Sequence, residues 1–194
     1  ALPSTQIAAL TTTATAVLST VQIEALSTPQ FAALGAAAIG ALTSTQLEAL
    51  TTTRLAALTA TQMQALSADQ ISALSTTGFA ALAATALAGL ATTTIAELSA
   101  GRLAALTTTQ LRGLAATQIA ALTGEQLAAF DTTRIAALAQ TQIRGLTATE
   151  VGQLSSEQLA ALTSSQIGWL ATSALEGLGE TQIAALTTTQ VAGL

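Results

Sequence analysis

Large apolar residues recur along the chain with a period of eight residues. Stepping by eight from Ile7 to Val191 gives 24 positions, all of which hold Ile, Leu, Val, Phe or Met except Thr15. A second apolar position follows each of these three residues later, and it is Leu in every copy except Phe130. Because no insertion or deletion breaks this phase, we predict that residues 1–194 form one uninterrupted array of octads.

The polar half of the octad is equally regular. Ser, Thr or Asp follows the Leu in 16 of 24 octads, and Gln or Glu comes three residues later in 15 of 24, as in Thr43 and Gln46. In this pattern the hydroxyl accepts a hydrogen bond from the backbone N–H three residues on, and the Gln side chain returns to the N–H of the cap residue. Ala and Leu, which fill the rest of the octad, favour helix. The consensus [ST]-x-x-Q-[IL]-A-A-L therefore predicts a helix start in almost every octad.

Three folds can place residues with this spacing. In one continuous helix, eight residues overshoot two turns by roughly 80°, so the apolar stripe would wind rapidly around the rod. In a β-solenoid, residues three apart point to opposite faces, and both apolar positions would face inward only with a corner inside I-A-A-L. We therefore predict an all-α solenoid, or superhelix, of very short helices, one per octad, bent at each Ser/Thr cap. A β-solenoid with strands at the Thr-rich segments is the alternative.

The number of octads in one coil stays open. Phe31 and Phe79 are six octads apart, which suits three octads per coil, whereas Gly113, Gly145 and Gly177 recur in every fourth octad, which suits four. The chain starts at Ala1 without Met and ends in phase at Leu194. We therefore expect a fragment of a longer array.

Composition excludes several classes of function. Only 8% of the residues are charged and the net charge is −5, which does not support nucleic-acid binding. Mean hydropathy is +0.60. Even so, the longest run without Thr, Gln or a charge, Phe31 to Leu42, is shorter than the roughly 20 apolar residues of a membrane span. We expect no membrane span.

Catalytic chemistry has few candidate residues. The chain contains no His, Cys, Lys or Tyr, and a Ser or Thr nucleophile needs a base to activate it. Glu24 with Glu48, and Glu176 with Glu180, are the nearest carboxylate pairs, and we interpret both as solvated surface positions. No Asp-rich calcium loop is present. We predict that the chain is not an enzyme and has no catalytic residue, cofactor or metal site.

Four exceptions to the octad are candidate partner-contact residues. Trp169 occupies a position that is otherwise mostly Ala or Gly, and Arg54, Arg102 and Arg134 replace the Gln. For the arginines we favour a helix former on a solvated face. For Trp169 the alternatives are an outward-facing contact residue and a large plug that the adjacent Gly168 accommodates.

Threonine clusters suggest a separate hypothesis. In a solenoid they would stack into a flat array of hydroxyl and methyl groups, which is typical of ice-binding surfaces. The alternative is that Thr fills helix caps and short polar corners. The clusters are Thr11–Thr13, Thr51–Thr53, Thr107–Thr109 and Thr187–Thr189.

The octads of Thr59–Leu66 (T-A-T-Q-M-Q-A-L) and Leu122–Ala129 (L-T-G-E-Q-L-A-A) resemble the L-T-T-x-Q-[IL]-x-A tandem octapeptides of large bacterial surface or secreted proteins, which are often labelled heme-utilisation or adhesion proteins. The resemblance covers the whole chain and implies an adhesin-like stalk or array. Heme binding is not carried over, because the chain has no His or Cys and Met63 stands alone at an apolar position.

The resulting functional hypothesis is a non-catalytic array of a bacterial extracellular or cell-surface protein that acts as a stalk, spacer or adhesion surface. Its partners would be the neighbouring repeats of the parent protein and a protein or glycan surface. The alternative is a dedicated binding module that uses its regular outer face for ice, a glycan or a protein partner.

Overall fold

Each octad forms one short helix in the computed structural model, which describes residues 3–194. The helices are four to six residues long, and no strand occurs in the described part of the chain. The all-α solenoid is therefore confirmed, and neither the continuous helix nor the β-solenoid occurs there. Leu2, the first member of the Leu series, lies outside the described residues.

The chain divides into two compact units, Ala1–Glu97 and Leu98–Leu194. The first contains α1 (Ser4–Ala8), α2 (Thr12–Ala16), α3 (Thr20–Glu24), α4 (Thr28–Ala32), α5 (Ala36–Gly40), α6 (Ser44–Glu48), α7 (Thr52–Ala56), α8 (Ala60–Gln64), α9 (Ala68–Ala73), α10 (Thr76–Ala80), α11 (Ala84–Leu87) and α12 (Thr92–Glu97). The second contains α13 (Ala100–Ala104), α14 (Thr108–Gly113), α15 (Ala116–Ile119), α16 (Gly124–Ala128), α17 (Thr132–Ala136), α18 (Gln140–Arg144), α19 (Ala148–Gln153), α20 (Ser156–Ala160), α21 (Ser164–Ile167), α22 (Thr172–Leu175), α23 (Glu180–Ala185) and α24 (Thr188–Val191).

The cap residue and the Leu before it interrupt the helices. Thr43, the N-cap of α6, has the extended angles φ −72° and ψ 160°, and its hydroxyl accepts a 3.2 Å hydrogen bond from the N–H of Gln46. Leu114, which follows α14, is also extended, with φ −69° and ψ 139°. No described residue has a positive φ, so the corner between octads needs no glycine. A polar cap and an extended leucine are enough to bend the chain.

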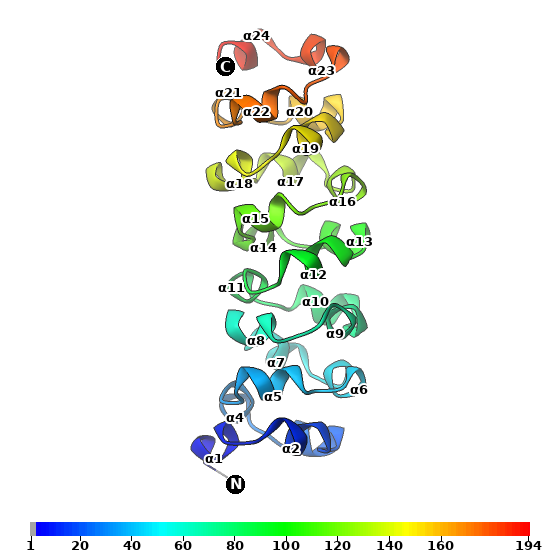
Figure 1. The fold of residues 1–194 in the computed structure, drawn as a ribbon, viewed down its shortest axis with the longest axis vertical. Coiled ribbons are helices and arrows are strands. Elements are labelled where there is room, and N and C mark those ends of the chain that lie inside the picture. The colour runs from blue at the N-terminus through cyan, green and yellow to red at the C-terminus, as the bar shows by residue number, and fades with distance from the viewer. Residues whose placement is uncertain (1–2) are drawn as a thin grey trace. The chain divides into compact units, whose positions relative to one another are not determined.

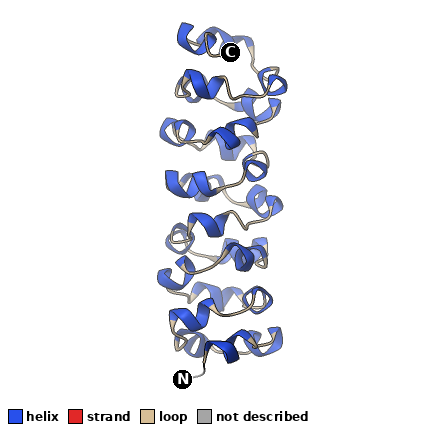
Figure 2. Ribbon diagram, turned by 90° about the vertical axis from the view of Figure 1, so that its left-hand side faces the viewer, coloured by secondary structure: helices blue, strands red, loops and turns tan. Residues whose placement is uncertain are grey.

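Within each unit, the short helices wind into a coil whose turns stack on one another (Figure 1). Figure 2 shows that the helices lie across the stacking direction and that loops connect them. A helix packs against the third helix after it, as α2 does against α5 and α13 against α16. Hydrogen bonds from the side chains at the Gln position reach residues 28 to 31 positions earlier, as from Gln142 to Leu114 and Leu111. One coil therefore holds more than three octads and fewer than four, which explains why both periodicities occur in the sequence.

The core consists of the two apolar positions of each octad. Leu47, Ile71 and Leu111 are fully buried, and the leucines that follow them are at most 6% exposed. Thr15 is also fully buried, and its hydroxyl donates a 3.0 Å hydrogen bond to the carbonyl oxygen of Thr11. That local bond lets a polar residue occupy a position where every other octad has an apolar one.

Small residues allow successive turns to approach closely. A Cβ atom added to Gly177 would lie 1.9 Å from the carbonyl oxygen of Ala148, the first residue of α19. Gly89 has the same relation to Ala60, at 2.0 Å. At these two sites only glycine fits, as the preference for small residues before the Leu indicates.

None of the helices in residues 3–194 combines the length and the apolarity needed to cross a lipid bilayer.

Candidate functional site

The glutamine of the octad has two roles, one local and one between turns. In α20, Gln158 Oε1 accepts a 2.9 Å hydrogen bond from the N–H of Ser155, while Ser155 Oγ accepts from the N–H of Gln158 at 3.1 Å. The other end of the same amide reaches the preceding turn, where Gln158 Nε2 donates to the carbonyl oxygens of Phe130 at 2.7 Å and Leu127 at 2.9 Å. The sequence pattern predicts the local bonds, but nothing in it indicates the second set.

The second role matters because those carbonyls are buried. Carbonyls at a helix end have no i+4 partner in their own helix. Leu127 accepts a 3.1 Å hydrogen bond from the N–H of Phe130, and the Gln158 amide adds a second donor to it and one to Phe130. Equivalent donations run from Gln46 to Leu18 in the first unit, and from Gln142 to Leu114 and Gln190 to Leu162 in the second. A ladder of amide donors therefore joins successive turns in both units. We call these side chains the glutamine ladder.

The singled-out arginines Arg54 and Arg134 belong to this ladder rather than to a solvated face. Arg54 Nη2 donates to the carbonyl oxygens of Glu24 at 2.5 Å and Leu26 at 2.6 Å, and Arg134 Nε donates to Leu106 at 3.1 Å. All three arginines are half-buried, and burial lowers the pKa of the Arg102 guanidinium. The interpretation of Arg54 and Arg134 as freely solvated helix formers is therefore wrong, because a guanidinium can donate to the preceding turn as the Gln amide does. Their role as partner contacts stays a prediction.

Glu150 is the one carboxylate at the glutamine position, and it is buried at 5% exposure. Its Oε2 accepts a 2.7 Å hydrogen bond from the N–H of Thr147, so the local half of the motif is kept. An ionised carboxylate has no hydrogen to donate to the preceding turn. Burial raises the pKa of Glu150, while the hydrogen bonds from Thr147 lower it to a smaller extent. Protonation would restore a donor at the place where the other octads have the amide.

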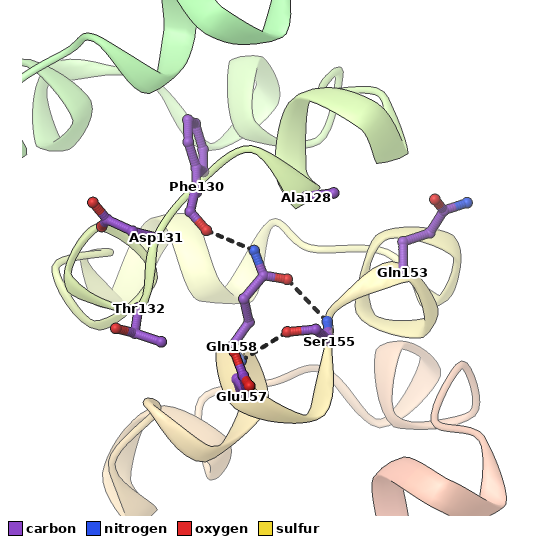
Figure 3. Close-up of a pocket in the computed structure, with 8 residues that line it drawn as sticks. All are labelled: Ala128, Phe130, Asp131, Thr132, Gln153, Ser155, Glu157 and Gln158. Carbon is purple, nitrogen blue, oxygen red and sulfur yellow. Dashed lines mark hydrogen bonds between the residues drawn. The ribbon is translucent and has the colours of Figure 1, made fainter.

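The candidate functional site is a cavity of about 350 Å³ in the second unit (Figure 3). It is lined by residues of two successive turns around the ladder residue Gln158. Asp131 and Thr132 lie on one side of Gln158 in the figure, and Gln153 lies on the other. The remaining lining residues are Ala128, Phe130, Ser155 and Glu157.

Several residues that line the cavity are uncommon at their octad positions. Phe130 replaces the Leu, Asp131 replaces the Ser/Thr cap, and Gln153 replaces the usual small residue. A Cβ atom added to Gly124 would lie 1.7 Å from Gln153 Oε1, so Gly124 makes room for the larger side chain. This pairing was not predicted. The signal that could reveal it is a large residue at the small position, together with a glycine at the start of the octad helix one coil earlier.

The lining of the cavity provides several hydrogen-bonding groups. Asp131 Oδ1 caps α17 by accepting from the N–H of Arg134 at 2.8 Å, and its other oxygen forms an ion pair with the Arg134 side chain. Ser155 and Thr132 supply hydroxyls, Gln153 an amide and Glu157 a second carboxylate. These groups suit a polar ligand held by hydrogen bonds.

A second cavity, of about 320 Å³, lies between α14 and α17. Its lining includes Thr108, Thr109 and Thr133, together with Arg112. Arg112 Nε donates a 2.7 Å hydrogen bond to the carbonyl oxygen of Ala137, so this arginine also joins two turns. Thr108 and Thr109 belong to one of the threonine clusters, which are exposed along their length.

The threonine clusters do not stack on one another. The helix after Thr11, α2, contacts α5, whose corner is Gly35-Ala36-Ala37. The helix after Thr187, α24, contacts α21, whose corner contains Ser164 and Ser165. The expected flat array of stacked clusters is therefore absent at these two places.

Trp169 and the paired glutamates lie outside the cavities. Trp169 is half-buried directly after Gly168, the C-cap of α21, so it is neither fully outward-facing nor a fully enclosed plug. The four glutamates of the two carboxylate pairs are all exposed. Within residues 3–194, no three His, Cys, Asp or Glu side chains gather as a metal-ligand cluster.

Comparison with protein families gives a match over most of the chain. The sequence model of the ALTTAQ repeat matches residues 1–36, 22–52, 39–76, 95–132 and 135–172. No curated protein matches the chain. The matched segments follow one another in tandem and coincide with the helical octads described above. The chain therefore belongs to the ALTTAQ repeat family.

Proposed function

We propose that residues 1–194 act as one non-catalytic structural array of a bacterial extracellular or cell-surface protein, serving as a stalk, spacer or adhesion surface. The observation that carries this proposal is the glutamine ladder. The glutamine that recurs through the array donates to carbonyls of the preceding turn, as Gln142 and Gln166 do at their respective sites. The glutamine side chains thus stabilise the stack of turns, while small residues such as Thr45 and Thr53 are exposed on its outer surface.

Two measurements test this proposal. An antibody raised against the chain is expected to label intact cells of the encoding bacterium; labelling that requires permeabilised cells would exclude a surface location. Exchanging the exposed threonines that precede the Gln or Arg position, such as Thr45, Thr53 and Thr61, for serine is expected to leave cell adhesion unchanged. A loss of adhesion in that variant would contradict the spacer role and favour recognition through the outer face.

A dedicated binding module is the second candidate, and the cavity around Gln158 favours it. Carboxylate, amide and hydroxyl groups from two turns surround a space of about 350 Å³. Groups of these kinds recognise the hydroxyls of a glycan or polar groups of a protein. A stacked threonine plane for ice would instead require neighbouring corners of like composition, and Gly35-Ala36-Ala37 beside Thr11–Thr13 does not provide it.

A glycan microarray distinguishes the two candidates. If the cavity binds a glycan, Gln153→Ala is expected to abolish a saturable signal that the unmodified chain gives. Gln140→Ala is the matched control, because Gln140 is an exposed glutamine of the same unit outside both cavities. Equal loss in both variants, or no signal from the unmodified chain, would exclude this site as a glycan receptor.

A further inference from the structure

Among the described residues that line the cavity between α14 and α17, Arg112 carries the charge. Its Nε donates a 2.7 Å hydrogen bond to the carbonyl oxygen of Ala137, which lines the same cavity. This bond holds the guanidinium at the cavity by tying it to the following turn. In the described part of the chain Arg112 has no carboxylate partner. Its two Nη groups are therefore available to a ligand.

Threonine hydroxyls from both helices line the same cavity. Thr108 and Thr109 belong to α14, and Thr133 belongs to α17. The cap of α14 is Thr107, whose hydroxyl accepts a 3.2 Å hydrogen bond from the N–H three residues on, and the cap of α17 is Asp131. The other threonines are thus not needed as caps, and within residues 3–194 their hydroxyls have no protein partner. They too are available to a ligand.

The charge at this cavity is opposite in sign to that of the whole chain. The chain carries a net charge of −5, but Arg112 is the charged residue of α14, and Asp131 neutralises Arg134 at α17. Glu157, on α20 beyond α17, lines the other cavity. An anion therefore meets one uncompensated positive charge here, while the net charge of the chain disfavours non-specific binding of anions.

These groups fit a sugar that carries a carboxylate. A guanidinium binds a planar, singly charged carboxylate through two parallel hydrogen bonds. The threonine hydroxyls match the hydroxyls of a sugar ring, and the methyl groups of Ala136 and Ala137 offer an apolar contact to its C–H groups. A cavity of about 320 Å³ lies at the lower end of the range for ligand sites, which suits one sugar residue.

We propose that the cavity between α14 and α17 binds a uronic acid residue of an acidic saccharide. The Nη groups of Arg112 hold the carboxylate, and the hydroxyls of Thr108, Thr109 and Thr133 bind the ring hydroxyls. This site is separate from the cavity around Gln158. The proposal rests neither on that cavity nor on the spacer role, so the loss of either would leave it standing.

An NMR titration of the ¹⁵N-labelled chain with trigalacturonic acid tests the proposal. Saturable shifts are expected at the backbone amides of Thr109 and Thr133, and neutral galactotriose is expected to cause none. Arg112→Met should raise the dissociation constant at least about tenfold, because the charge-assisted hydrogen bonds are lost. Thr133→Val, on the other helix, should raise it about threefold through the loss of one hydroxyl.

Arg144→Met is the matched control. Arg144 is an exposed arginine at the same octad position in the same unit, and it lies outside both cavities. Its replacement is expected to leave the dissociation constant unchanged, and circular dichroism of each variant checks that the helices persist. Absence of saturable shifts, equal binding of galactotriose, or equal weakening by Arg144→Met would overturn the proposal. A glutamate tripeptide that binds as tightly as the saccharide would overturn the assignment to a sugar.

Discussion

Gln142 and Leu114, which are 28 residues apart, are joined by a 2.8 Å hydrogen bond from the side-chain Nε2 to the carbonyl oxygen. The same nitrogen donates to Leu111 at 2.7 Å. Replacing Gln142 with Met keeps the length of the side chain but leaves both buried carbonyls without this donor. We expect the free energy of unfolding, measured in urea, to fall by about 1–3 kcal/mol.

Gln22→Met is the matched control for that prediction. Gln22 accepts the same local hydrogen bond, from the N–H of Ser19 at 2.8 Å, but its side chain is exposed in the first turn. Replacing Gln22 with Met is expected to lower the free energy of unfolding by less than Gln142→Met does, because only the local hydrogen bond is lost. Equal losses for the two variants would mean that the bonds between turns add nothing to stability.

Glu150→Gln is expected to stabilise the protein, and the gain should depend on pH. Burial raises the pKa of Glu150 in the folded state, so the folded state holds its proton to higher pH than the unfolded state does. The contribution of Glu150 to the free energy of unfolding is therefore greatest at low pH, and it is lost as the pH rises through the folded-state pKa of Glu150. The neighbouring helices α16 and α22 supply no counter-charge, since Glu125 and Glu176 are the charged residues in or next to them.

Urea unfolding near pH 4 and at pH 7 measures this dependence. Gln supplies the donor that ionised Glu150 lacks. At pH 7 the substitution should therefore raise the free energy of unfolding by about 1 kcal/mol. Near pH 4 the gain should shrink, because protonated Glu150 regains a donor. Glu157→Gln, on the exposed side of α20, is the control and should show a smaller change between the two pH values. A gain from Glu150→Gln that is constant over pH would refute the argument.

Ala139→Ser should stabilise α18 by completing its cap. Gln142 Oε1 already accepts from the N–H of Ala139 at 2.9 Å, but alanine has no oxygen to accept from the N–H of Gln142. A hydroxyl there should add about 0.5–2 kcal/mol to the free energy of unfolding. The reverse change, Ser155→Ala, removes a 3.1 Å bond of this kind and should lose a similar amount. Thermal unfolding of both variants checks the pair; the same sign for both would contradict it.

Gly177→Ala and Gly101→Ala should have opposite effects on stability. At Gly177 the new Cβ would meet the backbone of Ala148, so the turns must separate, at a cost of about 1–3 kcal/mol. At Gly101 no atom lies within 4 Å of the new Cβ, and Gly101 is inside α13. There alanine should stabilise by about 0.4–1 kcal/mol. Denaturant unfolding of both variants tests this, and a destabilised Gly101→Ala would contradict it.

The local structure could be predicted from the sequence because its causes lie within one octad. Thr43, Gln46 and Leu47 carry the cap and the apolar position that place α6 where the structure has it. The contacts between turns could not be predicted in this way. Gln142 follows the octad pattern although its cap residue is Ala139, and an eight-residue period does not show that its partner lies 28 residues away. The arginines were misinterpreted for the same reason, since Arg54 donates to the earlier turn while its sequence position suggests a surface helix.

The regular pairing of the helices also has an evolutionary meaning. Because each helix packs against the third helix after it and the octads are built alike, the loss or duplication of one octad gives the neighbouring octads new partners of equivalent construction. Genetic exchange between repeats can therefore change the length of the array one octad at a time. Gly124 and Gln153 show how such a change is accommodated. The end of the Gln153 side chain lies where a Cβ atom on residue 124 would be, and because this side chain is exposed and flexible it can turn aside when another residue replaces Gly124. This segment should therefore tolerate length changes as the rest of the array does.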